Sequence, residues 1–83
     1  MQDIEVINQK THDVVMDILP MATREELSDN NLFSLGLDSV SAITLVLSLE
    51  DTFGVKLEQS DISVENFCTI GDIVKLIKRK EEI

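Results

Sequence analysis

The residues best suited to chemistry in this sequence are an aspartate and a serine that stand side by side where a polar loop meets an apolar stretch. Asp38 and Ser39 follow Gly36 closely and precede the aliphatic run that begins at Val40. Both residue types are favoured helix N-caps, so capping alone can explain the pair, and a functional serine can also stand at a cap. Ser39 can therefore be a cap, a reactive group or both.

The rest of the chain offers little to make Ser39 a catalytic nucleophile, which needs a neighbouring base and donors for an oxyanion. His12 is the only histidine, and it falls on the polar side of the first predicted helix, where we expect a solvated imidazole. Cys68 is the only cysteine, so neither a disulfide framework nor a cysteine-based zinc site is expected. We expect no catalytic residues and no metal site. If Ser39 reacts, another protein must supply the base and the metal ion.

The net charge narrows the range of partners. Sixteen acidic and seven basic residues give a net charge of −9 at pH 7. Such a surface repels nucleic acid and anionic membranes and attracts proteins with basic patches. No apolar run is long enough to span a bilayer, and the first ten residues do not resemble a signal peptide. We therefore expect a cytoplasmic monomer with no nucleic-acid partner and no membrane insertion.

The spacing of apolar residues predicts three main helices within a single domain of residues 1–83. They cover about residues 3–19, 39–53 and 70–79. Pro20 ends the first helix, Gly54 closes the second as a C-cap, and Thr69 opens the third. The second helix is apolar around most of its circumference, so we expect it to lie at the centre of the bundle.

The two connecting segments carry weaker signals. Residues 20–38 are predicted to form a long loop, which can include a turn of helix over residues 23–27. In the second connector, residues 55–69, we expect Ser60 and Asp61 to open one short helix. The predicted fold is therefore all-α: a small four-helix bundle of three main helices and one short helix, with a long loop between the first two.

Three motifs follow one another along the chain. They are G-L-D-S-V at residues 36–40, followed by an aliphatic helix, then L-E-D-T-F-G-V at residues 49–55 and T-I-G-D-I-V-K-L-I at residues 69–77. In this order they resemble the acyl carrier protein family over about residues 4–80. The first motif extends upstream to D-x-x-L-F-x-L-G-x-D-S, which runs from Asp29 to Ser39. The resemblance implies a four-helix bundle with a long first loop, which agrees with the predicted elements.

The resemblance also implies a function. In that family the serine after the aspartate accepts 4′-phosphopantetheine from coenzyme A as a phosphodiester, and Ser39 matches this position. The thiol of the arm then carries an acyl or aminoacyl group as a thioester. A free-standing, non-catalytic carrier is implied, with a phosphopantetheinyl transferase, an acyl- or aminoacyl-loading enzyme and downstream synthase or transferase enzymes as partners. The alternative is an unmodified helical interaction or scaffold module that keeps the carrier fold.

The predicted helix after Ser39 departs from the pattern of fatty-acid carriers, in which its exposed face is rich in acids. Residues 40–49 contain no acid. We therefore expect apolar and hydroxyl contacts near the serine to recognise partner enzymes, together with a few acids at the ends of the helix. The residues expected to take part are Asp38, Val40, Ile43, Glu50 and Asp51, with Glu58 or Asp61 as further acids. The neutral helix favours a specialised pathway: polyketide, nonribosomal peptide or modified fatty acid synthesis.

Overall fold

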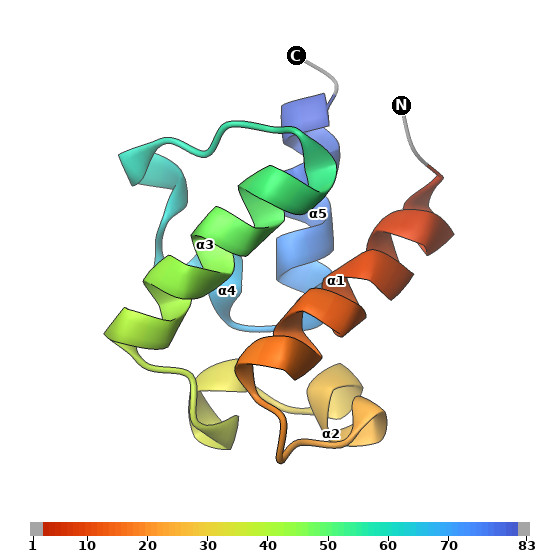
Figure 1. The fold of residues 1–83 in the computed structure, drawn as a ribbon, viewed down its shortest axis with the longest axis vertical. Coiled ribbons are helices and arrows are strands. Elements are labelled where there is room, and N and C mark those ends of the chain that lie inside the picture. The colour runs from red at the N-terminus through yellow and green to blue at the C-terminus, as the bar shows by residue number, and fades with distance from the viewer. Residues whose placement is uncertain (1–2, 82–83) are drawn as a thin grey trace.

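Five α-helices and two short 3₁₀ turns make up the described part of the chain (Figure 1). The computed structural model describes residues 3–81, apart from the side chains of residues 28 and 29. The α-helices are α1 (Ile4–Ile18), α2 (Arg24–Asp29), α3 (Ser39–Phe53), α4 (Val64–Phe67) and α5 (Ile70–Glu81), and the 3₁₀ turns are η1 (Leu32–Leu35) and η2 (Gln59–Asp61). Residues 3–81 contain no strand, so the predicted all-α fold is confirmed. None of the described helices has both the length and the apolar character needed to cross a bilayer.

α3 has the bounds that the sequence predicts, because a side-chain cap opens it and a glycine closes it. The Asp38 carboxylate accepts a hydrogen bond from the Ser41 N–H at 2.8 Å, and the Ser41 hydroxyl accepts one from the Asp38 N–H at 3.0 Å. This reciprocal pair satisfies donors that the helix itself leaves unpaired. Gly54 closes the helix in the left-handed conformation, with a φ of +66°, which glycine adopts readily. Local interactions therefore fix the start of α3, where Ser39 lies.

α1 and α5 also begin at side-chain caps. The Asp3 carboxylate accepts from the Glu5 N–H at 2.9 Å, and the Thr69 hydroxyl accepts from the Asp72 N–H at 3.1 Å. The cap at Thr69 is confirmed, and α5 continues to Glu81, two residues beyond the predicted end.

The long loop predicted between the first two main helices contains a helix of its own. α2 opens with a capping box, in which the Thr23 hydroxyl accepts from the Glu26 N–H at 3.1 Å and the Glu26 carboxylate accepts from the Thr23 N–H at 2.9 Å. Leu27 is fully buried and anchors α2 to the core. The turn of helix predicted over residues 23–27 is therefore a helix of six residues, and the described chain has five α-helices rather than four. T-R-E-E, at residues 23–26, is the capping-box pattern that marks its start.

The short helix of the second connector begins later than predicted. Ser63 caps α4, and its hydroxyl accepts from the Asn66 N–H at 3.3 Å. Ser60 and Asp61 lie instead in η2, so the prediction that they open the helix is wrong. Phe67, at the end of α4, is buried and fixes this segment to the core.

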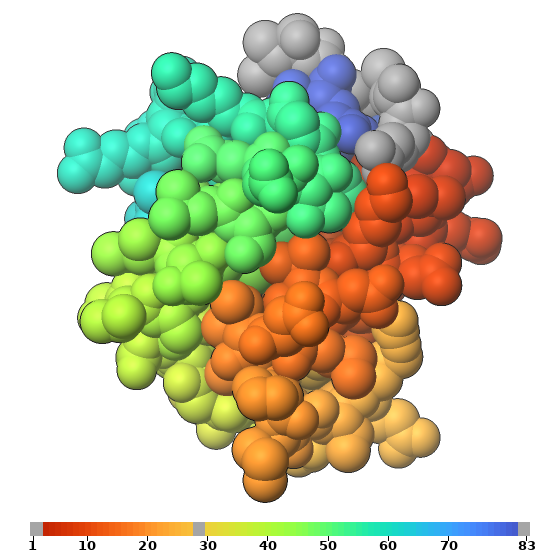
Figure 2. Space-filling view, viewed as in Figure 1, coloured from red at the N-terminus to blue at the C-terminus, as the bar shows by residue number. Residues whose placement is uncertain are grey.

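α1, rather than α3, is the helix that the other long helices share. It packs against both α5 and α3 and is buried over a wide arc. α3 buries one face only, through Ala42, Leu45, Val46, Leu49 and Phe53. The outward side of α3 lies open on the face shown in Figure 2. The prediction that this helix lies at the centre of the bundle is therefore wrong.

Candidate functional site

Ser39 stands at the first position of α3 with its side chain exposed. Its hydroxyl makes no hydrogen bond to the described part of the chain. The nearby Ser41 hydroxyl is by contrast committed to the cap, because it donates to Asp38 Oδ1 at 2.7 Å. Ser39 is therefore the serine of this junction whose hydroxyl a second protein can reach.

Asp38 caps the start of α3 and does not activate the hydroxyl of Ser39. The Ser41 N–H, followed by the Ser41 hydroxyl, holds the pKa of the Asp38 carboxyl below its usual value. The carboxylate is therefore ionised at neutral pH, with its lone pairs directed to the cap. An aspartate held in this way is a poor general base for Ser39.

The loop that leads to Ser39 is anchored to the core. Leu32 and Leu37 are buried, and the Leu32 N–H donates to the Cys68 carbonyl at 2.7 Å. Between them Gly36 ends η1 with a φ of +114°, a conformation that residues with a side chain rarely adopt. Ser39 is therefore presented by a fixed turn.

An apolar groove of about 320 Å³ lies beside Ser39. One wall is formed by α3 and the other by the segment that joins η2 to α4 and by α4 itself. The lining residues are Phe33, Ser39, Ala42, Ile43, Ile62, Ser63, Val64 and Phe67. A narrow and largely apolar chain attached to Ser39 can therefore lie against the protein.

Ser39 and the groove fit a 4′-phosphopantetheine arm. The exposed hydroxyl can form the phosphodiester, and the positive end of the α3 dipole favours a phosphate at this position. The apolar lining suits the methyl and methylene groups of the chain that follows the phosphate. Attached there, the group would supply a terminal thiol that carries an acyl group as a thioester.

Comparison with known proteins agrees with this arrangement. Residues 9–77 match the family model described as a phosphopantetheine attachment site. The chain belongs to the acyl carrier protein family. Its carriers are not catalysts, and their cofactor is covalently bound 4′-phosphopantetheine.

Individual carriers align over most of the chain. The acyl carrier protein of Prochlorococcus marinus is 36% identical over 78 residues, which are 93% of this chain and 95% of that protein. The acyl carrier protein of Amoebophilus asiaticus is 31% identical over 75 residues, 89% of this chain and 91% of that protein. Acyl carrier protein 4, chloroplastic, of Arabidopsis thaliana is 35% identical over 71 residues, 84% of this chain and 50% of that protein.

In this carrier the residues predicted to recognise partner enzymes differ in their exposure and in their hydrogen bonds. Val40 and Ile43 are 75% and 58% exposed and flank the start of α3 close to Ser39. Asp51 is exposed near the other end of the helix. Glu50 is only partly exposed and accepts the Leu57 N–H at 2.9 Å, so its carboxylate is held by the connector that follows α3.

The exposed apolar residues on α3 or beside the groove that were not predicted as site residues are Leu47, Ile62 and Val64. Leu47 is 62% exposed and continues the row of Val40 and Ile43 along the outward side of α3. We refer to Val40, Ile43 and Leu47 as the outward stripe. Val64 is 64% exposed and lies on the opposite wall of the groove. Helical spacing reveals the outward stripe in the sequence, but it does not show that the stripe stays exposed.

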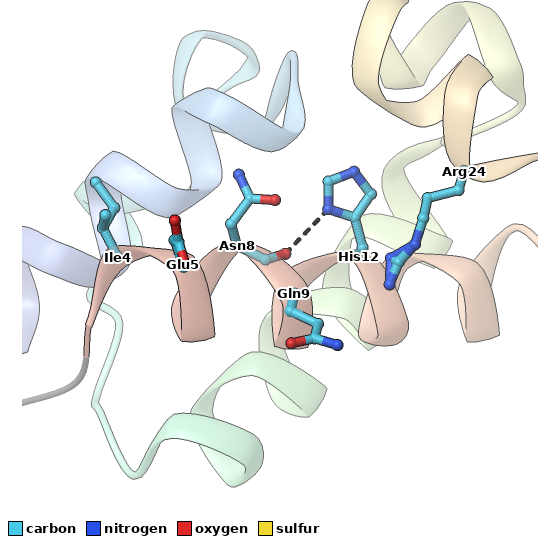
Figure 3. Close-up of a pocket in the computed structure, with 6 residues that line it drawn as sticks. All are labelled: Ile4, Glu5, Asn8, Gln9, His12 and Arg24. Atoms are coloured by element: carbon cyan, nitrogen blue, oxygen red, sulfur yellow. Dashed lines mark hydrogen bonds between the residues drawn. The ribbon is translucent and has the colours of Figure 1, made fainter.

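A larger hollow of about 620 Å³ lies along α1 and shares no residue with the groove (Figure 3). Its lining residues are Ile4, Glu5, Asn8, Gln9, His12 and Arg24. His12 is only 6% exposed, and its Nδ1–H donates to the Asn8 carbonyl at 3.0 Å, so the prediction of a solvated imidazole is wrong. The only imidazole of the carrier belongs to this hollow rather than to the groove of Ser39.

Proposed function

We propose that Ser39 is the residue that receives 4′-phosphopantetheine, and that the chain carries acyl or aminoacyl thioesters between the enzymes of a specialised biosynthetic pathway. The observation that supports this proposal most directly is the exposed Ser39 hydroxyl, without a hydrogen bond in the described chain, at the rim of an apolar groove. Of the two other serines near this site, Ser41 is occupied by the cap of α3 and Ser63 by the cap of α4.

The chemistry requires little from the carrier beyond this hydroxyl. The Ser39 oxygen displaces adenosine 3′,5′-bisphosphate from coenzyme A, so one oxygen–phosphorus bond forms as another breaks. The proton passes to a base on the transferase, which also brings the Mg²⁺ ion that neutralises the pyrophosphate. The carrier contributes a hydroxyl held at a fixed place and a helix N-terminus that favours the resulting phosphate.

We further propose that partner enzymes dock on the surface around the start of α3. The transferase, a loading enzyme and the downstream synthase or transferase enzymes would bury Val40 and Ile43, with Leu47 as a third member of the outward stripe. Asp38 would contribute charge beside the serine and Asp51 at the far end. Glu50 would act mainly through the connector that it holds, because the Leu57 N–H already occupies its carboxylate.

The neutral exposed face of α3 supports a specialised pathway. It presents apolar and hydroxyl side chains where an acidic surface would select basic partners. A carrier recognised through such a face is suited to a small set of dedicated enzymes, such as those of polyketide, nonribosomal peptide or modified fatty acid synthesis. Action in the cytoplasm as a monomer is part of the same proposal.

Modification of Ser39 is tested by mass measurement on the intact protein. Incubation with coenzyme A and a broad-specificity phosphopantetheinyl transferase should add about 340 Da, the mass of the arm. Ser39→Ala should abolish the gain, whereas Ser34→Ala, which removes an exposed hydroxyl from the preceding loop, should retain it. A gain that persists in Ser39→Ala, or a wild type that stays unmodified while a control carrier is loaded, contradicts the proposal.

The same measurement on protein from its native host separates the carrier from an unmodified scaffold module. A carrier should show the mass of the arm, and any further mass released by thioester cleavage should identify the cargo. A native population entirely at the unmodified mass would support the scaffold alternative.

A further inference from the structure

The two walls of the groove beside Ser39 are held in different ways. The α3 wall belongs to a helix of 15 residues whose inner face is buried in the core. Opposite α3 lie Phe67, which is buried in the core, and the wall formed by residues 62–64, between the end of η2 and the first residue of α4. Ile62 and Val64 are exposed, so burial of their own side chains does not fix this wall. Other contacts must therefore help Phe67 to set the distance between the wall and α3.

Asp61, directly before this wall, has bonds at both its side chain and its backbone. The carboxylate oxygen Oδ2 accepts the Glu58 N–H at 2.8 Å and lies 2.7 Å from Lys80 Nζ. The Asp61 carbonyl accepts a hydrogen bond from the Asn66 side-chain amide at 2.8 Å. The bond from Asn66 joins the two ends of the wall to each other, and the bond from Lys80 joins the wall to α5.

The ion pair with Lys80 is a substantial interaction for a surface residue. The Asp61 and Lys80 side chains are only 16% and 17% exposed, so solvent and salt screen the pair less than they screen an exposed one. Lys80 also lowers the pKa of Asp61, with help from the Glu58 N–H, so the carboxylate is charged at neutral pH. α5 itself is packed against α1 and provides a fixed support.

We propose that the Asp61–Lys80 ion pair is a latch that holds residues 62–64 at a fixed distance from α3 and so keeps an arm on Ser39 within the groove. Asp61 and Lys80 are positioning residues, because neither lines the groove. When the latch is broken, the wall keeps its local bond to Asn66, whose side-chain oxygen accepts a hydrogen bond from Arg79 of α5 at 3.4 Å, but Asp61 loses its charged contact with α5. The groove then opens, and an attached arm spends more time in solvent. The position of the wall is a property of the unmodified chain, and only the effect on the arm rests on the proposed function.

The latch can be tested first on the unmodified protein. Lys80→Met removes the charge and keeps a long side chain, and Lys75→Met makes the same change at an exposed position of α5. Hydrogen exchange should be followed by NMR at the Ile62 and Phe67 amides, which donate to the Gln59 and Ser63 carbonyls. We expect exchange about tenfold faster in Lys80→Met, as for the loss of one charge-assisted hydrogen bond, and unchanged in Lys75→Met. Equal rates in the two variants, or acceleration spread evenly over α1, α3 and α5, overturn the latch.

Asp61→Asn provides a second route if Lys80→Met fails to fold. The amide oxygen can still accept the Glu58 N–H, but the charge that attracts Lys80 is lost. We expect the same local acceleration as in Lys80→Met and no further large increase in the double variant, because both changes break one interaction. Fully additive acceleration would show that the two side chains act independently and would overturn the latch.

A second measurement reads the arm itself. A coenzyme A derivative with an environment-sensitive fluorophore on its thiol is loaded onto the wild type, Lys80→Met and Lys75→Met. Because the chain has no Trp or Tyr, the emission reports on the probe. We expect red-shifted emission and faster quenching by acrylamide in Lys80→Met alone. Identical emission in all three loaded proteins overturns the inference. A wild type that does not load contradicts the proposed function, and the exchange measurement then decides the latch by itself.

Discussion

Asp38 and Ser39 are neighbours with different tasks. Asp38 ends the loop and starts α3 through its hydrogen bonds with Ser41, so the helix does not depend on the Ser39 side chain. Ser39 has a helical backbone, and its exposed hydroxyl makes no hydrogen bond within the described chain. With this division, a phosphodiester on the Ser39 hydroxyl would leave the cap intact, as the proposed modification of a folded carrier requires.

The cap makes a prediction about stability and pH. The folded-state pKa of Asp38 lies below the usual value of 3.8, so its contribution is fully present above that value and is lost as the pH falls through the lowered pKa. We expect Asp38→Ala to lower the urea midpoint by a constant amount near neutral pH and by a shrinking amount below about pH 4. Circular dichroism at 222 nm measures the midpoints, and Asp51→Ala, at an exposed position of the same helix, is the control. A difference that stays constant into strong acid contradicts this account of the cap.

At the scale of elements, the apolar pattern shows which side chains can be buried but not how many neighbours a helix has. α1 packs against both α3 and α5. More of its circumference is therefore buried than its apolar residues cover, and the buried residues include Thr11 and His12. α3 packs chiefly against α1, so only part of its apolar circumference is buried. Val40 and Ile43 lie on the remaining part and stay exposed. The wrong predictions of a solvated His12 and of a central α3 share this cause.

Local signals account for what the sequence predicts well. The ends of α3 and the start of α5 follow from the caps at Asp38, Gly54 and Thr69, which involve residues close in sequence. The position of Ser39 at the start of α3 follows from the same cap. The far wall of the groove, residues 62–64, comes from a distant connector whose path depends on contacts with α5, and no local pattern predicts those contacts.

The exposed side of α3 makes a prediction about docking. Ile43→Ser should leave the stability nearly unchanged, because most of the side chain is already in water. It should lower kcat/KM for a broad-specificity transferase by about tenfold or more, since burying an isoleucine at an interface contributes about 1.5 kcal/mol or more. Val6→Ser, at an exposed position of α1, is the control and should load at the wild-type rate. Normal loading of Ile43→Ser would show that the outward stripe does not contact the transferase.

At the scale of the whole molecule, the charge is both large and unevenly placed. The net charge is −9, whereas α5 carries most of the bases. They are Lys75, Lys78, Arg79 and Lys80. The acids are spread over the other elements, where like charges repel and oppose the compact state. α5 therefore provides positive charge that balances part of the negative charge of the bundle, and in the Asp61–Lys80 pair this attraction includes a contact of 2.7 Å.

This distribution predicts that salt stabilises the protein. Between about 10 mM and about 200 mM sodium chloride the Debye length falls from about 30 Å to under 10 Å, which weakens the widespread repulsion more than the largely buried Asp61–Lys80 pair. We expect the urea midpoint to rise over this range. The rise should be smaller in the double variant Asp17→Asn/Asp51→Asn, which removes two exposed charges without disturbing a cap. A urea midpoint that falls with salt would mean that ion pairs, rather than repulsion, dominate the electrostatic free energy of folding. In that case the Asp61–Lys80 pair would stabilise the whole bundle and not only one wall of the groove.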